Sequence, residues 1–246
     1  MTQASRPSLI ETMKADADAL IALLPYHLRR LKQSALALGY VYPDDAAVIA
    51  AIEAALDHFD QSDTASLIST SASPAIPFAQ VTDLCGTRVR LLLNPAGELD
   101  IQTAPLPVLQ GVPFIALTDL KLESTERFLQ HKTTHRPWYD ATPQWLSQHP
   151  DFFDLIFLNE KGELCEGSRS NIYVLKDGEW LTPPLSSGLL GGVLRTQLLE
   201  TGRAKEAILT PSDLTADKTS IRLSNALRGW FDVRMSPSIL PGCFLP

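Results

Sequence analysis

The most informative segment of the chain is Glu166-Gly167-Ser168-Arg169-Ser170-Asn171-Ile172-Tyr173. Lys132 precedes its glutamate by 34 residues (166 minus 132), and the run Gly191-Gly192-Val193-Leu194-Arg195 follows it. A lysine amine can form a Schiff base, and a carboxylate can pair with a pyridinium nitrogen. Amides at a glycine-rich helix start can hold a phosphate group. These are the three groups that pyridoxal phosphate requires.

The composition is that of a folded protein of one large domain or two lobes. The chain has 246 residues, 45% of them apolar and 20% charged, which suffices for a sizeable core. The N-terminus lacks an apolar signal core, and the apolar stretches are too short or too interrupted to span a bilayer, so a cytoplasmic protein without a membrane partner is expected.

Charge and cysteine content exclude several classes of site. A formal net charge of −7 argues against nucleic acid or anionic membranes as partners, because phosphate backbones require a positive surface. Any anionic ligand must then be held by local arginines. Cys85, Cys165 and Cys243 are widely spaced and include no CxxC pair, so free thiols are expected rather than disulfides or zinc ligands. His131 and His135 would share one helix face, but no third ligand accompanies them, and no metal site is predicted.

The sequence predicts two lobes, residues 1–104 and 105–246, joined near the prolines of Thr103–Pro107. In the first lobe, apolar spacing predicts a helix over Pro25–Leu38, ended by Gly39, and a second from Asp44-Asp45 to about His58. The second helix is expected to bury Ile49, Ile52, Leu56 and Phe59. Asn94–Gly97 separates two strand candidates, Arg88–Leu93 and Glu98–Thr103, and indicates a hairpin.

In the second lobe, strands dominate around the proposed site. Strands are predicted over Pro113–Leu117, Asp154–Leu158 and Asn171–Leu175, with turns at Asn159–Gly162 and Lys176–Gly178. An apolar periodicity predicts a helix over Leu189–Thr201, followed by Gly202. The fold class expected from these elements is α+β.

Taken alone, Lys132 reads as an ordinary solvated loop lysine, Glu166 as a surface acid and Asn171 as a turn residue. The longer pattern favours a site and resembles the class IV aminotransferase family, also called fold type IV. The positions that match its signature in order and spacing are Glu166, Asn171-Ile172-Tyr173, Thr182, Leu190, Gly192, Val193 and Arg195. Trp180 departs from it, standing where an aliphatic residue or phenylalanine is usual.

The resemblance implies a two-lobed pyridoxal-phosphate enzyme with a small N-terminal α/β lobe and a larger, strand-rich C-terminal lobe. It places Lys132 at the C4′ atom of the cofactor and Glu166 at the ring nitrogen N1. It assigns phosphate contacts to the Val193 and Leu194 amides, Arg30 and Asn225. The tyrosine that faces O3′ in relatives is absent from its usual place, and Tyr139 is the candidate replacement. A homodimer is also implied.

The resemblance is strongest to 4-amino-4-deoxychorismate lyases of the type fused behind an aminodeoxychorismate synthase. Lys132–Asp140, read as Lys-Thr-Thr-His-Arg-Pro-Trp-Tyr-Asp, is similar to their lysine segment. Branched-chain aminotransferases carry an Asn-Tyr pair where Arg136-Pro137 stand. The start at Leu9–Asp16, without the further strand of free-standing relatives, gives the same expectation and suggests that synthase as a partner.

The expected activity is the lyase reaction, which gives the folate precursor 4-aminobenzoate and pyruvate. The alternatives are an aminotransferase acting on branched-chain or D-amino acids with 2-oxoglutarate and, last, a non-catalytic relative. The lyase substrate is a small dicarboxylate, which several cations must hold. The candidates are Arg88, Arg90, Arg136, Arg222 and Arg228, although ordinary surface charge would account for about half of such residues.

Overall fold

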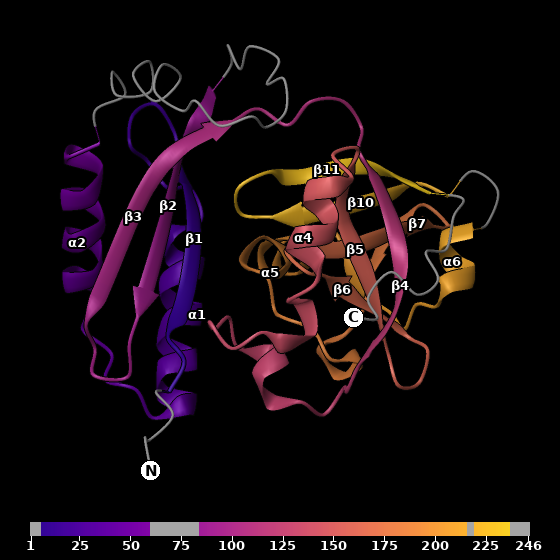
Figure 1. The fold of residues 1–246 in the computed structure, drawn as a ribbon, viewed down its shortest axis with the longest axis horizontal. Helices are drawn as coiled ribbons and strands as arrows, with labels where there is room; N and C mark the ends of the chain where they lie inside the picture. The colour runs from indigo at the N-terminus through magenta and orange to yellow at the C-terminus, as the bar shows by residue number, and fades with distance from the viewer. Residues whose placement is uncertain (1–5, 60–83, 216–218, 237–246) are drawn as a thin grey trace. The chain divides into compact units, whose positions relative to one another are not determined.

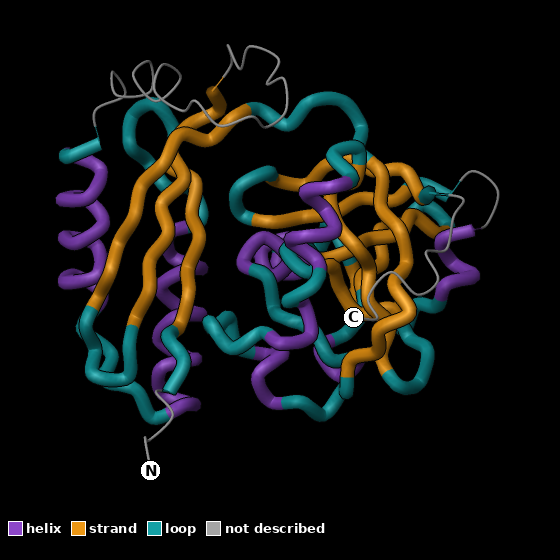
Figure 2. The backbone as a smooth tube through the Cα atoms, in the orientation of Figure 1, coloured by secondary structure: helices purple, strands orange, loops and turns teal. Residues whose placement is uncertain are grey.

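The computed structural model describes residues 6–59, 84–215 and 219–236. The chain forms two compact units, Met1–Leu109 and Gln110–Pro246. Both combine helices with a sheet, as the α+β expectation requires (Figures 1 and 2). None of the helices in the described ranges has both the length and the apolar character needed to cross a membrane.

The first unit holds a three-stranded antiparallel sheet in the order β1-β2-β3. Its strands are β1 (Leu9–Ala15), β2 (Leu84–Leu93) and β3 (Leu99–Pro107). Two helices accompany the sheet, α1 (Leu24–Leu38) and α2 (Asp45–Asp57) (Figure 1). The predicted hairpin and both predicted helices are confirmed.

Local chemistry explains where the two helices begin and end. Gly39 follows α1 with φ 66°, a left-handed conformation in which a residue without a Cβ atom is favoured. The Asp44 side chain accepts a hydrogen bond of 2.8 Å from the Ala47 amide and caps α2. Of the predicted buried stripe of α2, Ile52 is confirmed, whereas Ile49, Leu56 and Phe59 are only half-buried. Val48, which was not predicted, is the other buried residue of this helix.

The prolines expected in a linker lie instead in β3, where Pro105 pairs with Thr87 across from β2. β3 is an edge strand, so a residue without an N–H group can point its nitrogen away from the ladder. The division between units falls after Leu109, while the division predicted after residue 104 lies within β3.

The second unit is built on an eight-stranded mixed sheet in the order β6-β5-β4-β11-β10-β7-β8-β9. Its strands are β4 (Phe114–Leu122), β5 (Phe152–Asn159), β6 (Leu164–Gly167), β7 (Asn171–Lys176), β8 (Glu179–Thr182), β9 (Lys205–Glu206), β10 (Ile221–Asn225) and β11 (Gly229–Met235). Its helices are α4 (Thr142–Gln148), α5 (Val193–Glu200) and α6 (Pro211–Thr215) (Figure 1). Short 3₁₀ helices cover Arg127–Gln130, Pro137–Tyr139 and Leu185–Ser187.

The sheet must curl strongly between β6 and β7. These strands are five places apart in the sheet, which in a flat sheet would be about 24 Å. Yet Gly167 ends β6 and Asn171 begins β7, and a chain of four residues reaches roughly 14 Å at most. Curling brings the sheet edge back toward β7, and the carboxylate predicted to face the cofactor lies at this junction.

The predicted helix over Leu189–Thr201 began too early, since α5 starts at Val193. Gly191 and Gly192 precede it in non-helical conformations, because glycine disfavours a helix interior. The amides of Val193 and Leu194 therefore belong to the first turn of α5. Such amides have no partner within the helix.

Candidate active site

Glu166 lies near the end of β6 and is almost completely buried, with 4% of its surface exposed. Its Oε1 atom accepts a hydrogen bond of 2.9 Å from the Tyr139 hydroxyl. Its Oε2 atom accepts a longer one of 3.3 Å from the Asn171 amide. Burial raises the Glu166 pKa to about 7, against the opposing effects of Arg136, Tyr139, the Leu190 backbone and Lys132. The surface-acid alternative is therefore wrong.

Asn171 explains why the signature pairs a glutamate with an asparagine and a later glycine. Its Nδ2 atom donates to Glu166 and also to the Leu190 carbonyl, at 2.9 Å. Its Oδ1 atom lies so close to Gly192 that a Cβ atom there would approach it to 2.0 Å. Asn171 thus joins the buried carboxylate to the turn that starts α5, and only glycine fits at residue 192.

Asp154 on β5 holds the loop between Glu166 and Asn171, a role that the sequence did not reveal. It is fully buried and accepts hydrogen bonds from the Ser168 amide (2.9 Å), the Ser168 hydroxyl (2.7 Å), the Arg169 amide (3.0 Å) and the Ser170 hydroxyl (2.6 Å). The run Ser-Arg-Ser was the available signal, because it offers donors that a buried carboxylate can collect. Asp154 thereby fixes the junction of β6 and β7.

Lys132 lies in an irregular segment after the 3₁₀ helix at Arg127–Gln130 and is half-buried. Thr133 beside it is fully buried, and its hydroxyl bonds both the carbonyl and the amide of His135, at 3.1 and 3.2 Å. The charge of Lys132 acts on Glu166. The structure thus brings Lys132 into the electrostatic neighbourhood of Glu166, within the same unit.

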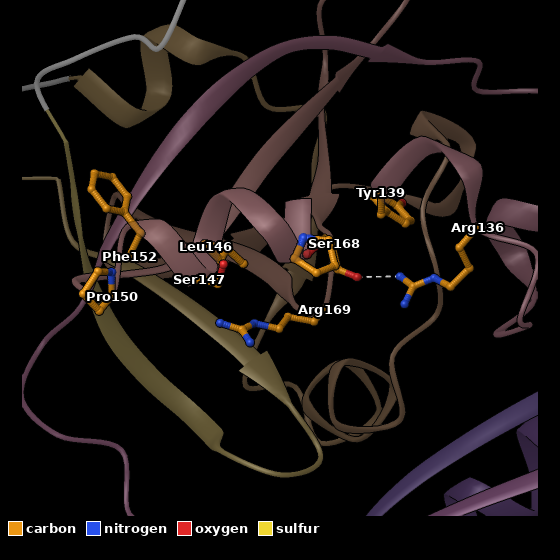
Figure 3. A pocket seen from close by; sticks show the side chains of 9 residues that line it. Arg136, Tyr139, Leu146, Ser147, Pro150, Phe152, Ser168 and Arg169 are labelled. Carbon is orange, nitrogen blue, oxygen red and sulfur yellow. Dashed lines mark hydrogen bonds between the residues drawn. The ribbon is translucent and has the colours of Figure 1, made fainter. Parts of the chain in front are cut away.

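The Tyr139 ring is held between Arg136 and Phe157. The Arg136 guanidinium carbon lies 4.7 Å from the ring centre, and the Phe157 ring meets it edge-on at 4.9 Å. Arg136 also donates to the Ser168 carbonyl (Figure 3). The Tyr139 hydroxyl thus contacts the carboxylate predicted to face N1, and the role at O3′ expected from the sequence stays a prediction.

A cavity of about 470 Å³ opens beside this group. Arg136, Tyr139 and Ser168 line one end, and Pro150 and Phe152 line the other (Figure 3). Neither Lys132 nor Glu166 lines it. Tyr139 therefore separates this cavity from the Glu166 carboxylate.

The elements predicted to hold phosphate have different surroundings. The N-cap of α5 is Gly192, which has no side chain to cap the first-turn amides of Val193 and Leu194. Asn225 already bonds the Leu227 and Arg228 amides at 3.1 and 2.8 Å, and also the Arg169 carbonyl, so it shapes the β10–β11 turn.

Arg30 lies on α1 in the first unit and forms a two-pronged pair with Glu11. Its Nε atom donates to Glu11 Oε1 at 2.8 Å, and its Nη2 atom donates to Oε2 at 2.5 Å. His27 Nδ1 lies 2.6 Å from the same carboxylate. Glu11 therefore orients the guanidinium predicted to bind phosphate, and that phosphate contact itself stays a prediction.

The remaining candidate arginines occupy several parts of the chain. Arg88 and Arg90 share one face of β2, opposite to the buried Val89 and Leu91. Arg228 lies in the β10–β11 turn. Arg222 bonds Asp232 at 2.7 Å and covers the Trp180 and Trp230 rings, each at 4.7 Å, which is a structural role. Trp180 thus packs against an arginine, which accounts for the departure from the signature.

Other reactive groups have ordinary environments. Cys85 and Cys165 are free thiols, and Cys243 lies outside the described residues. Burial and nearby carboxylates raise the Cys165 pKa, so this thiol is not activated. Among the residues that the structure describes, no three His, Cys, Asp or Glu side chains are grouped to hold a metal ion.

Comparison with known proteins identifies the class of this arrangement. Residues 8–235 match the family described as "Amino-transferase class IV". The "Putative aminodeoxychorismate lyase" of Schizosaccharomyces pombe is 30% identical over 202 residues, which are 81% of this chain and 76% of that protein. The chain belongs to the class IV aminotransferase family and is an enzyme of this pyridoxal-phosphate-dependent class.

Two solved structures have the same fold. A "Putative amino-acid aminotransferase" from Mesorhizobium loti is 30% identical, with a TM-score of 0.77 and coverage of 94% of this chain and 100% of that one. A "hypothetical aminotransferase" from Mycobacterium tuberculosis in its PLP-bound form is 21% identical, with a TM-score of 0.67 and coverage of 95% and 83%. The predicted two-lobed fold type is confirmed.

The residues of the second unit fit pyridoxal phosphate. Glu166 is a buried carboxylate whose pKa burial raises to about 7, so a cationic ring nitrogen beside it would offset the cost of its charge. Gly192 leaves no room for a Cβ atom beside Asn171 and precedes the uncapped first turn of α5, which suits a phosphate. Lys132 is the amine predicted to bind the aldehyde.

Proposed function

We propose that this enzyme is a lyase that converts 4-amino-4-deoxychorismate to 4-aminobenzoate and pyruvate, a step toward folate. The observation that carries the proposal is the segment Lys132–Tyr139. Arg136-Pro137 stand where branched-chain aminotransferases have their Asn-Tyr pair, and here Arg136 packs on Tyr139, which bonds Glu166. The name of the Schizosaccharomyces pombe relative supports the same reaction.

Four residues would hold the cofactor in the second unit. Lys132 would bind its aldehyde carbon, Glu166 its ring nitrogen, and the Val193 and Leu194 amides its phosphate, with Arg30 as a further proposed phosphate ligand. When bound, pyridoxal phosphate supplies an electron sink conjugated to the substrate carbon that loses a proton. Glu166 supports that sink, because a carboxylate beside the ring nitrogen favours its protonated form.

Lys132 is proposed to move the proton. With the substrate bound at the cofactor, the Lys132 amine would act as general base and take the proton from the substrate ring carbon that bears the amine. The bond between the neighbouring ring carbon and the enolpyruvyl oxygen then breaks. Lys132 returns the proton to the methylene carbon of the leaving group, which departs as pyruvate. The proton is thus conserved, and the ring that remains is aromatic.

Arg136 is less suited to the substrate carboxylates than the sequence suggested. Arg136 packs on Tyr139, the hydrogen-bond partner of Glu166. Glu166 would face the ring nitrogen of the cofactor, whereas the substrate would be carried at the aldehyde carbon, on the opposite side of the cofactor ring. Arg88, Arg90 and Arg228 remain the proposed carboxylate ligands. A substrate with two carboxylates needs cationic ligands in a protein whose formal net charge is −7.

The experiment is turnover of enzymatically generated 4-amino-4-deoxychorismate by the cofactor-loaded protein. Equal amounts of 4-aminobenzoate and pyruvate should form, whereas Lys132→Ala should form neither. Pyruvate is followed by a coupled dehydrogenase and 4-aminobenzoate by chromatography. Formation of glutamate from an amino donor and 2-oxoglutarate, without 4-aminobenzoate from the first substrate, would overturn the proposal.

A class IV aminotransferase is the second candidate. The Mesorhizobium loti protein, named as an amino-acid aminotransferase, is as similar in sequence as the named lyase, since both are 30% identical. The assay with branched-chain and D-amino acids plus 2-oxoglutarate therefore belongs beside the lyase assay. Activity in the amino-donor assay alone would favour this candidate.

We also propose a homodimer, because isologous pairing is the commonest assembly of soluble enzymes. An aminodeoxychorismate synthase is the proposed source of the substrate and the proposed binding partner. Sedimentation of the active, cofactor-loaded protein tests the dimer. A monomer with full activity at the assay concentration would contradict it.

A further inference from the structure

Tyr139 makes the shorter of the two side-chain hydrogen bonds to the Glu166 carboxylate. Its hydroxyl donates at 2.9 Å, whereas Asn171 donates at 3.3 Å, beyond the usual length of an N–H···O bond. Asn171 also divides its amide between Glu166 and the Leu190 carbonyl. The Leu190 backbone also hydrogen-bonds this carboxyl group, and Tyr139 is the side chain whose donor contacts Oε1.

Several contacts fix the position of the Tyr139 hydroxyl. Tyr139 is 6% exposed and ends a single 3₁₀ turn in which its amide bonds the Arg136 carbonyl at 3.1 Å. Phe157 meets its ring edge-on, and the Arg136 guanidinium lies over the ring face. Arg136 itself is anchored to the Ser168 carbonyl, on the loop that Asp154 holds (Figure 3).

The electrostatics of this group favour a neutral Tyr139 donor, whereas burial opposes the charge of the Glu166 acceptor. Burial, and next the charge of Glu166, raise the Tyr139 pKa well above its usual value, so the hydroxyl keeps its proton. Arg136 and the Tyr139 hydrogen bond both lower the Glu166 pKa against the larger effect of burial. Removing either would leave a buried carboxylate that is harder to ionise.

We propose that Tyr139 is a positioning residue: its hydroxyl, fixed by the Arg136 guanidinium on its ring, holds the Glu166 carboxylate in one orientation and makes its charged form less costly. The consequence for the reaction rests on the proposed function, in which Glu166 faces the ring nitrogen. The hydrogen bond between Tyr139 and Glu166 does not depend on the proposed function. Tyr139 touches neither the substrate nor the cofactor in this role and acts through Glu166.

The experiment compares Tyr139→Phe with Tyr40→Phe in the full chain. Tyr40 is the matched control, since it is also 6% exposed and its hydroxyl donates to the Pro7 carbonyl, within the other unit. Carboxyl-labelled glutamate allows the titration of Glu166 to be followed by carbon NMR, with and without pyridoxal phosphate. The Glu166 signal is assigned from the spectrum of Glu166→Gln.

Tyr139→Phe should raise the Glu166 midpoint by about one to two pH units, the equivalent of one hydrogen bond to a charged group. The pH at which the bound cofactor changes its absorbance should shift too, and kcat should fall about tenfold with little change in KM. Tyr40→Phe should change none of these. Incorporating 3-fluorotyrosine at residue 139 restores a hydroxyl and should restore kcat.

An unchanged Glu166 titration in Tyr139→Phe would overturn the proposal and leave Tyr139 a core residue only. If that variant fails to fold, Arg136→Met provides the second test, because it keeps an apolar side chain over the ring but removes the charge. It should also raise the Glu166 midpoint, and no shift there would equally overturn the proposal. A third outcome separates the two proposals. If Tyr139→Phe shifts the Glu166 titration but the native protein turns over neither 4-amino-4-deoxychorismate nor an amino donor, the proposed function is contradicted and the positioning role stands.

Discussion

A Cβ atom on residue 167 would lie 2.3 Å from the Oδ2 atom of Asp154, so glycine is required where the loop passes over that carboxylate. The backbone approaches this closely because Asp154 collects donors from the next three residues of the loop. A side chain at residue 167 would push the loop away from Asp154 and displace Glu166, which is its neighbour in the chain.

We therefore expect Gly167→Ala to destabilise the protein by about 1–3 kcal/mol, the usual cost of overpacking a buried site. Urea denaturation monitored by tryptophan fluorescence measures the change. Gly191→Ala is the matched control for stability, because its Cβ atom would meet only Leu185 Cδ2, at an ordinary 3.7 Å. Equal midpoints for the two variants would show that the loop can move away from Asp154 at no cost.

Borohydride treatment of the cofactor-loaded protein should attach pyridoxal phosphate to the peptide that contains Lys132. The expectation follows from the neighbourhood of Lys132 and Glu166, together with the uncapped start of α5. Mass spectrometry of the digest identifies the labelled lysine. Lys161→Ala, at an exposed turn, should keep the label, and Lys132→Ala should lose it. Label on another lysine in the native protein would remove Lys132 from the mechanism.

Glu166→Gln should lower kcat by roughly a hundredfold to a thousandfold, the typical effect of losing one preorganised charged contact. Cofactor affinity should fall much less, because the proposed phosphate contacts lie elsewhere. Turnover at saturating pyridoxal phosphate separates the two effects. If excess cofactor restores full activity to the variant, Glu166 does not face the ring nitrogen.

Glu11 should make folding stability dependent on acidic pH. Burial alone would raise its pKa, but Arg30 and His27 outweigh burial and lower it to about 2 from the ordinary 4.5. A carboxyl group whose pKa is lower in the folded state stabilises the protein above pH 4.5 and loses that contribution as the pH falls toward 2. The contribution is on the order of 3 kcal/mol.

Unfolding free energies measured at successive pH values between 6 and 2 test this expectation. Glu11→Gln should be less stable at neutral pH, because it leaves the Arg30 charge without its carboxylate partner, and its stability should depend less on pH in this range. If the unfolding free energy of Glu11→Gln depends on pH as steeply as that of the native protein, other carboxyl groups dominate acid unfolding.

Local signals in the sequence accounted for most elements with clear boundaries. Gly39, Asp44 and the Asn94–Gly97 turn mark ends that depend on a few neighbouring residues, and the structure has them there. The start of α5 was placed too early because apolar periodicity continues through Leu189 and Leu190, whereas the two glycines that follow delay the helix. Strand β1 carries no comparable turn signal and was not predicted.

In the candidate site too, features set by neighbouring residues could be predicted and features set by distant contacts could not. Glu166 and Asn171 could be found because the spacing of the signature is local, and the structure places them in contact. The pairing of Arg30 with Glu11 and the holding of the loop by Asp154 depend on contacts between distant elements. Tyr139 was expected to contact the cofactor directly. Its hydrogen bond to Glu166 depends on its packing between Arg136 and Phe157, which the sequence does not show.

The place of β11 in the curled sheet has a consequence for protein synthesis. This strand, Gly229–Met235, lies between β4 and β10 and is the last strand of the described chain to be translated. The edge of β4 that pairs with β11 has no partner strand until about 120 further residues are made, which takes roughly 6–24 s at ribosomal speed. During that time it is a bare strand edge that could pair with another chain. Slow translation or early termination before residue 235 should therefore favour aggregation of the nascent protein.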